Sequence, residues 1–394
     1  MTDKLRHIER LWLIITLAVY ALASYLIMPN IDNTAGLGKD NTAYYYIAAF
    51  AVSVPYLFIT LRRILCWGQS KTVWFFILFF IWATAATCMS LEGVSHIVYI
   101  SFTILPLLIS YTYFRRYESD RFLYTIFFAS LLLVSYQYFQ IYQIANLVDV
   151  AHIGVSYFSL ILLPLVLLHP SRLVRIIAWV VTSIVIVSAI KRGGILTLVI
   201  GALVYVWCRQ FISERRNLAV LLAIIGLGVF AYGIYYMVTF LESDILERFL
   251  HMQEDQGSGR LEIWQTVIED LRQSDTTSFL VGHGYRSVNI SIGYESVPAH
   301  NDFLEVFYDF GLVGLMLYLV AWFYLIRDAI RLLRQKSPYA PTFCMMVACF
   351  FALSMVSIVI YYFWVTYFAI MIGLILGQRE LELSQAQPCH ETVG

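Results

Sequence analysis

The sequence predicts an all-α polytopic membrane protein with about 12 transmembrane helices. Hydrophobic residues form 60% of the 394 residues and charged residues only 13%, and the mean hydropathy is +0.74. Apolar runs recur along the chain at lengths near the roughly 20 residues that a helix needs to cross a bilayer. The 28 tyrosines and 9 tryptophans suit the two membrane interfaces, where amphipathic rings gather. These observations argue against an ordinary water-soluble domain.

The predicted helices follow the apolar runs in chain order. Residues 1–240 carry nine of them, and residues 303–377 carry the remaining three. The first run follows a basic start but lacks a convincing small-residue cleavage site, and apolar runs recur throughout the chain. It is therefore interpreted as a membrane helix and not as a signal peptide. The last two helices divide one long run near Tyr361, because that run is too long for a single crossing. The predicted spans are residues 11–28, 43–61, 73–90, 96–114, 122–143, 151–168, 173–189, 194–208, 218–240, 303–325, 342–359 and 361–377.

The basic residues predict the orientation of the chain. When the N-terminus is placed in the cytoplasm, most of the 26 lysines and arginines fall in inner segments, and every inner segment contains at least one of them. Both termini are then cytoplasmic, and residues 378–394 form a short cytoplasmic tail. The zero net charge gives no indication of a nucleic-acid partner. The six cysteines contain no CxxC pair, which argues against a zinc site or a disulfide framework.

Two cations break the charge pattern in the stretch SAIKRGGILTL. Lys191 and Arg192 fall in a tight turn between the seventh and eighth spans, on the outer side of the membrane. One interpretation is a pair at a helix end whose side chains reach the aqueous interface. The other is that the pair faces an anionic ligand, with Gly193-Gly194 permitting close approach of the backbone. The residues alone leave both interpretations open.

Residues 241–302 form the one long outer loop, which is long enough to cover a cavity. An amphipathic helix is predicted near residues 259–273 of this loop. Arg260 falls on the apolar face of that helix, where it either pairs with a loop carboxylate or binds an anion near the helix N-terminus. The predicted apolar stripe consists of Leu261, Trp264, Val267, Ile268 and Leu271.

Polar residues gather at the outer mouth of the tenth span. His300 and Asn301 precede the span, and three acids follow at spacings that share one helix face. Carboxylates inside a membrane are costly, so Glu305 and Asp309 are expected to line a site or to pair with arginines. Asp302 is a candidate cap for the helix.

Three short motifs therefore follow one another in the outer region. They are Arg192 after the seventh span, Gly259-Arg260 followed by Trp264 in the loop helix, and His300-Asn301 followed by Gly311-Leu312. Each motif is weak alone, but their order, spacing and common outer location form a more specific set. The set resembles the O-antigen ligase and O-antigen polymerase family of bacterial membrane glycosyltransferases.

This resemblance covers about residues 180–325 by motif and the whole chain by span count and loop position. It implies a GT-C-like membrane fold. The implied donor is a glycan on undecaprenyl pyrophosphate in the membrane lipid, and the acceptor is another glycan or lipid A-core. The implied site lies at the periplasmic face of the bacterial inner membrane and uses no cofactor and no metal. A chain-length regulator is a further expected partner.

The resemblance also implies roles for individual residues. Arg192 and Arg260 are expected to bind the pyrophosphate, because guanidinium groups offer permanently charged, bidentate contacts to phosphate. His300 is expected to be the general base that takes the proton of the acceptor hydroxyl, in a displacement that inverts the anomeric carbon. Further candidates for substrate binding are Lys191, Asn301, Glu305 and Asp309.

The motifs do not separate the reactions that the family hosts. We favour a polymerase, which joins one lipid-linked repeat to another. The alternatives are a ligase that transfers the glycan to lipid A-core, an enzyme that modifies protein hydroxyls, and a polysaccharide transporter or flippase. A transporter is disfavoured because no internal repeat is visible and the polar residues cluster at the outer mouth instead of near the midplane.

Overall fold

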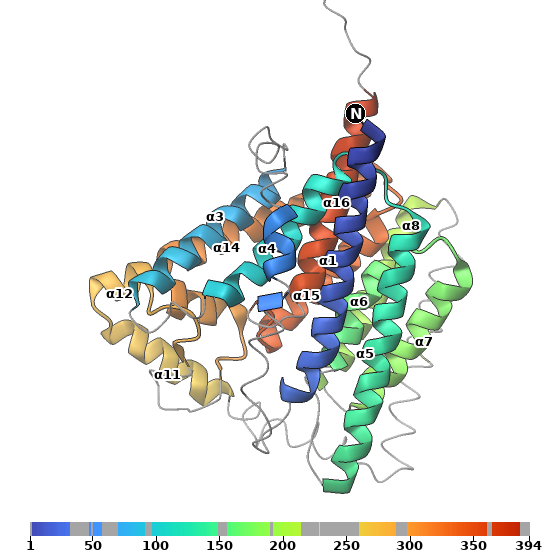
Figure 1. Ribbon diagram of the computed structural model, residues 1–394. Helices are drawn as coiled ribbons and strands as arrows, with labels where there is room; N and C mark the ends of the chain where they lie inside the picture. The colour runs from blue at the N-terminus through green and yellow to red at the C-terminus, as the bar shows by residue number, and fades with distance from the viewer. Residues whose placement is uncertain are drawn as a thin grey trace, which may run out of the picture. The chain divides into compact units, whose positions relative to one another are not determined.

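The regular elements of the described part of the chain are all α-helices, and no strand occurs among the described residues (Figure 1). This agrees with the predicted all-α class. The computed structural model describes residues 2–31, 47–48, 50–56, 70–90, 97–148, 156–189, 192–213, 228, 260–288, 298–360 and 365–386.

Four described helices have the length and apolar composition needed to cross a membrane. Three shorter helical segments are also apolar. The predicted span 43–61 lies partly outside the described residues, and 218–240 lies outside them except for Gly228. The total of about 12 spans therefore remains a prediction. The four long segments are α3 (Lys71–Met89), Arg121–Gln140 of α5 (Arg121–Val148), Gly193–Ile212 of α8 (Arg192–Ile212) and α14 (Asp302–Arg334), and the shorter ones are Thr103–Phe114 of α4 (Ile97–Phe114), α6 (Ser156–Leu167) and α15 (Ala340–Val356).

Helix ends differ from the predicted spans at two places near the C-terminus. The tenth span was expected at residues 303–325, but α14 continues to Arg334. The last span was expected to end at residue 377, but α16 (Val365–Ala386) continues past it, so the first part of the predicted tail is helical. Both extensions carry charged residues, which hydropathy alone excludes from a span although they are compatible with helix.

One compact unit comprises residues 1–80, 97–181 and 363–394. It contains α1 (Thr2–Ile31), α4, α5, α6 and α16, with α16 lying directly against α4. Glycines make this approach possible, because a Cβ atom on Gly373 would lie 2.7 Å from the carbonyl oxygen of Leu107. Small residues at such crossings let helix backbones come close within a membrane.

The second compact unit comprises residues 81–96 and 182–362 and contains all three motifs. Here α15 packs on α8 and α14, and two loop helices, α11 (Arg260–Gln273) and α12 (Thr276–Val281), pack on α14 (Figure 1). The seventh predicted span corresponds to α7 (Arg172–Ser188), which ends shortly before α8 begins. The long α14 therefore contacts α11, α12 and α15.

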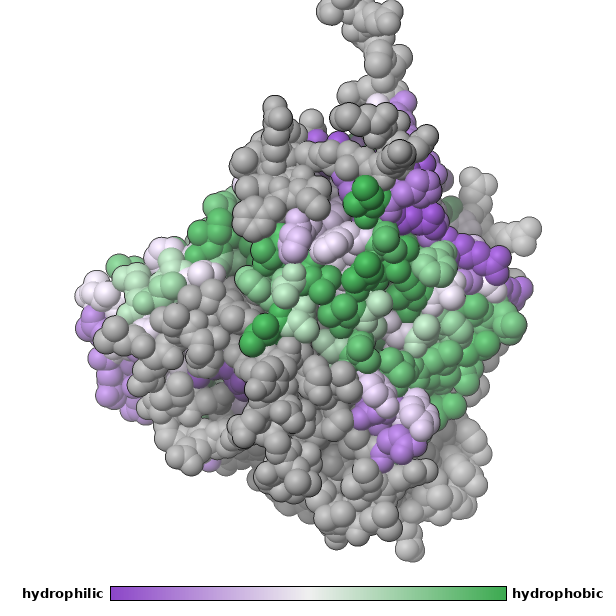
Figure 2. Space-filling view, viewed as in Figure 1, coloured by the Kyte–Doolittle hydropathy of each residue, from purple (hydrophilic) through white to green (hydrophobic). Residues whose placement is uncertain are grey.

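Hydrophobic side chains cover much of the exposed helix surface in the view of Figure 2. Large apolar side chains are exposed on several described helices, including Leu196 on α8 and Phe323 on α14, which are 55% and 62% exposed. Large apolar side chains in such numbers favour a hydrocarbon environment over water. The exposed surface and the apolar helices together are those of a membrane protein.

Candidate functional site

The N-terminus of α14 is capped by Asn301. Its side-chain oxygen accepts hydrogen bonds from the backbone amides of Phe303 and Leu304, at 3.0 and 3.1 Å. These amides have no partner within the first turn of a helix, and an asparagine at this position satisfies them. The expectation that Asp302 caps the helix is therefore wrong, because the preceding residue does so.

Asp302 is fully buried and binds the segment that follows α15. Its Oδ2 accepts a hydrogen bond from the hydroxyl of Ser354 at 2.6 Å, and its Oδ1 accepts from the backbone amides of Val359 and Ile360 at 2.7 and 3.3 Å. A buried carboxylate requires such donors, because burial without them is strongly unfavourable. Asp302 thus joins the start of α14 to the end of α15.

Glu305, one turn further along α14, binds the segment that precedes the helix. It is fully buried, and its Oε2 accepts a hydrogen bond from the backbone amide of Ala299 at 2.8 Å. Its Oε1 is also buried and has no hydrogen-bond partner among the described residues. The Ala299 amide lies directly before His300, so this bond fixes the backbone next to the predicted base.

Asp309 binds a turn in the segment between α12 and α14. It is fully buried, with Oδ2 accepting from the backbone amide of Arg286 at 2.6 Å and Oδ1 from that of Ser287 at 3.0 Å. The three acids therefore share a helix face as predicted, but each binds backbone amides of a different segment. The prediction that Asn301, Glu305 and Asp309 bind substrate is not tested by these contacts and stays a prediction.

The turn bound by Asp309 contacts α14 next to a break in that helix. Gly311 has φ 68° and ψ −173°, which interrupts the helix. The carbonyl oxygen of Phe310 accepts a hydrogen bond from the indole N–H of Trp82 at 2.9 Å, and that of Asp309 accepts from the Gly284 amide at 2.8 Å. The glycine-rich stretch after α12 thus supplies donors to carbonyls that the broken helix leaves open.

Glycine at position 311 is required by this close approach. A Cβ atom there would lie 2.3 Å from the carbonyl oxygen of Leu280, and the backbone angles are ones that only glycine adopts readily. We expect Gly311→Ala to lower the free energy of unfolding by about 1–3 kcal/mol. Thermal unfolding in detergent measures this, with Gly228→Ala as control, because a Cβ atom at Gly228 meets nothing within 4 Å. Equal midpoints for both variants would contradict the prediction.

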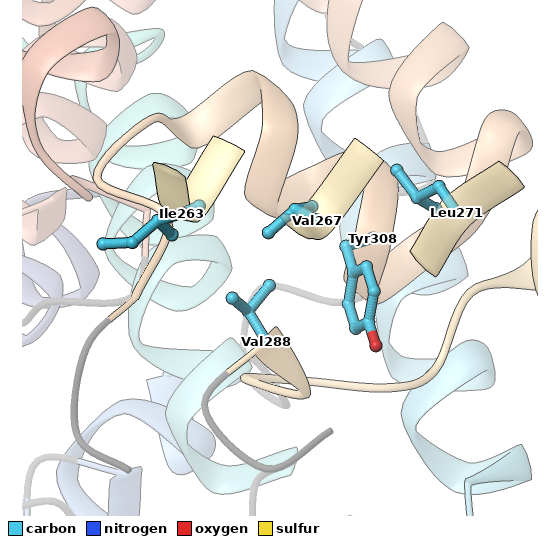
Figure 3. Close-up of a cluster of buried hydrophobic side chains, with 6 residues drawn as sticks. Ile263, Val267, Leu271, Val288 and Tyr308 are labelled. Atoms are coloured by element: carbon cyan, nitrogen blue, oxygen red, sulfur yellow. The ribbon is translucent and has the colours of Figure 1, made fainter. Parts of the chain in front are cut away.

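The predicted loop helix corresponds to α11, but its buried face differs in part from the prediction. Ile263, Val267 and Leu271 are buried and form a cluster with Val288 and Tyr308 (Figure 3). The expected stripe members Leu261 and Ile268 are instead 50% and 42% exposed. The stripe prediction was wrong for these two because α11 turns its face toward α14, a direction that periodicity does not specify.

Arg260 is the first residue of α11 and is half-buried on this same face, three and seven residues before Ile263 and Val267. This agrees with the predicted placement of a cation at the head of the apolar face. A helix N-terminus carries a partial positive charge and open amides, so the position suits an anion.

Two hydrogen bonds connect α11 to α14 and to the segment directly before α14. The indole N–H of Trp264 donates to the carbonyl oxygen of Ala299 at 2.7 Å, and the hydroxyl of Tyr308 donates to Asp270 at 2.5 Å. Trp264 is one turn after Arg260, and Ala299 is the neighbour of His300. The second and third motifs are thereby joined by a single hydrogen bond.

His300 has a left-handed backbone conformation, with φ 52°. It is half-buried and lies between Ala299, which is fully buried, and Asn301, which is 8% exposed. A histidine in this region costs about 1–3 kcal/mol and persists only where the surroundings hold it. Here the cap at Asn301 and the two bonds to Ala299 hold both sides.

Arg192 is the first residue of α8, which places it at the N-terminus of a membrane helix. Lys191 lies outside the described residues. Among the described residues, no group of three histidine, cysteine, aspartate or glutamate side chains is arranged to hold a metal ion.

Sequence reasoning placed Trp264 in the apolar stripe and in the second motif but missed its hydrogen bond to Ala299. Its signal was present, since it shares a helix face with Arg260 four residues earlier, but its partner is a backbone carbonyl 35 residues away. No periodicity indicates such a partner.

The region that contains the three motifs is similar to a known protein family. Residues 176–319 match the family model described as O-antigen ligase, and this stretch contains Arg192, Arg260 and His300. No curated protein matched the chain. The match confirms the resemblance to this family for the region that contains the three motifs. Residues 176–319 of the chain are therefore similar to the O-antigen ligase family.

Proposed function

We propose that this protein transfers a glycan from undecaprenyl pyrophosphate to an acceptor hydroxyl at the periplasmic face of the bacterial inner membrane. We favour a polymerase, whose acceptor is a second lipid-linked repeat. The proposal includes a GT-C-like arrangement of about 12 spans with both termini in the cytoplasm. Its main support in the structure is the hydrogen bond between Trp264 and Ala299, which connects the helix that begins at Arg260 to the neighbour of His300.

In this proposal the oxygen of the acceptor hydroxyl attacks the anomeric carbon while the bond to the pyrophosphate oxygen breaks. His300 takes the hydroxyl proton, and the pyrophosphate leaves with its lipid. Arg192 and Arg260 bind the leaving group, whose negative charge increases in the transition state, so fixed cations stabilise that state more than the ground state. One displacement of this kind inverts the anomeric configuration.

The remaining predicted residues have supporting roles. Lys191 attracts the lipid phosphate from the outer side. Asn301, Glu305 and Asp309 shape the acceptor side of the site, where their contacts hold the start of α14 and the turn at Arg286. A chain-length regulator is a further partner of a polymerase.

The test is product formation by the purified, full-length protein. It receives undecaprenyl-pyrophosphate repeat units alone and, separately, repeat units with lipid A-core. A ladder from repeat units alone supports the polymerase, and product only with lipid A-core supports the ligase. If the folded protein makes no product with either acceptor but moves lipid-linked glycan across the membrane of vesicles, the protein is a transporter and the proposal is wrong. Arg192→Ala is expected to abolish product, whereas Arg272→Ala, an exposed residue at the other end of α11, is not.

Turnover is expected to be independent of divalent metal. Arg192 and Arg260 supply the positive charge at the leaving group, so no metal is needed there. We expect equal initial rates with and without EDTA. A rate that falls on chelation and returns with Mg²⁺ or Mn²⁺ would show that a metal takes part.

A further inference from the structure

The conformation of His300 depends on the residue before it. The carbonyl oxygen of Ala299 and the amide nitrogen of His300 belong to one rigid peptide plane. The angle φ of His300 is the rotation about its N–Cα bond. A hydrogen bond to the Ala299 carbonyl therefore fixes the peptide plane on the nitrogen side of that bond. Because φ is 52°, a value unfavourable for histidine, the backbone would relax if the plane were released.

Two side chains bind the two backbone polar groups of Ala299. Trp264 of α11 donates to the Ala299 carbonyl at 2.7 Å, and Glu305 of α14 accepts from the Ala299 amide at 2.8 Å. Ala299 is 0% exposed, so water does not replace either bond. The two peptide planes that flank Ala299 are thus both fixed.

The two bonds also relate the two motifs to each other. Trp264 lies one turn after Arg260 on the same rigid helix, so the bond to Ala299 sets the position of the α11 N-terminus relative to His300. In a displacement reaction the leaving group and the base must act on the same sugar carbon in the same step. A shift of about 1 Å between such groups lowers the rate by as much as about 100-fold.

We propose that Trp264 and Glu305 are positioning residues that hold His300 in its reactive conformation through the backbone of Ala299. This inference rests on the proposed role of His300 as general base. It assigns to Glu305 a role through the Ala299 amide instead of direct contact with substrate. It also gives the tryptophan of the second motif a function beyond packing.

The first test uses matched aromatic variants. Trp264→Phe removes the bond to Ala299 and keeps an aromatic ring, whereas Tyr308→Phe removes the neighbouring bond between α14 and α11, at Asp270, and leaves Ala299 untouched. We expect Trp264→Phe to lower kcat on the order of 10-fold with little change in donor KM. Tyr308→Phe is expected to keep kcat. Equal kcat values for both variants at equal thermal stability would overturn the proposal.

The second test separates geometry from charge at Glu305. Glu305→Gln keeps an oxygen for the Ala299 amide, and it replaces the partnerless Oε1 by nitrogen without breaking a bond. We therefore expect Gln to retain kcat and its pH profile, and Glu305→Ala to lower kcat by about 10- to 100-fold. A loss in Glu305→Gln as large as in Glu305→Ala would show that the carboxylate acts through its charge, and would overturn the positioning role.

Hydrogen–deuterium exchange gives a readout that does not need activity. The amides of a peptide spanning residues 298–305 are expected to exchange faster in Glu305→Ala and Trp264→Phe than in the wild type and in Tyr308→Phe. If exchange changes as expected but the wild type makes no glycan product, the proposed function is wrong. The structural role of Trp264 and Glu305 at Ala299 is then still supported. If the wild type is active and exchange is unchanged in both variants, the inference itself fails.

Discussion

Replacement of His300 by glutamine is expected to lower kcat by about 10²- to 10⁴-fold, the range that general-base catalysis supplies. Glutamine is polar and similar in reach but cannot take a proton from the acceptor hydroxyl. The loss should appear in kcat and in kcat/KM together, because the interaction exists only in the transition state. Turnover of lipid-linked repeat units by purified protein measures it.

The pH profile gives an independent reading of the same variant. In the wild type the rate should fall as pH is lowered, because a protonated imidazole cannot act as base. The residual rate of His300→Gln should lack this fall. The control is His283→Gln, which changes the half-buried histidine stacked on Tyr308 with ring centroids 4.4 Å apart. If His283→Gln lowers the rate strongly and His300→Gln does not, His283 is the general base instead of His300.

Replacement of Arg260 by alanine is expected to lower kcat/KM by about 10²- to 10³-fold, as when one donor to a developing negative charge is removed. Arg260 begins α11 on its buried face. In the proposed function, its guanidinium group and the helix N-terminus bind the same pyrophosphate. Arg260→Lys retains the charge but loses the planar pair of donors, so an intermediate rate is expected. Steady-state kinetics with the lipid-linked donor varied separates kcat from KM.

Arg272→Ala is the matched control, since Arg272 lies in the last turn of the same helix and is exposed. It should change kcat/KM by less than about 3-fold, as expected for a surface charge. An Arg260→Ala enzyme with an unchanged donor kcat/KM would remove the pyrophosphate role from α11. In that case Arg192 alone would remain as the predicted ligand.

Local sequence features predicted the helical membrane class, the loop helix and the family. Apolar run lengths and helical periodicity depend on neighbouring residues, so they can be read directly from the chain. The same holds for the short motifs around Arg192, Arg260 and His300, which the family match at residues 176–319 contains. Two predictions from local sequence were wrong: the helix cap is Asn301 and not Asp302, and Leu261 is exposed and not part of the buried stripe.

What the polar side chains bind was decided by tertiary structure. Trp264 reaches a carbonyl 35 residues away, Asp309 an amide 23 residues away, and Asp302 an amide 57 residues away. The sequence showed three acids on one face and suggested arginine partners, because charge and spacing are visible in it. Backbone amides carry no sequence signature, and which of them meet a buried carboxylate depends on how distant segments pack. Hence residue types and their order follow from the chain alone, whereas the strained backbone at His300 and its supports exist only once α11, α14 and α15 are assembled.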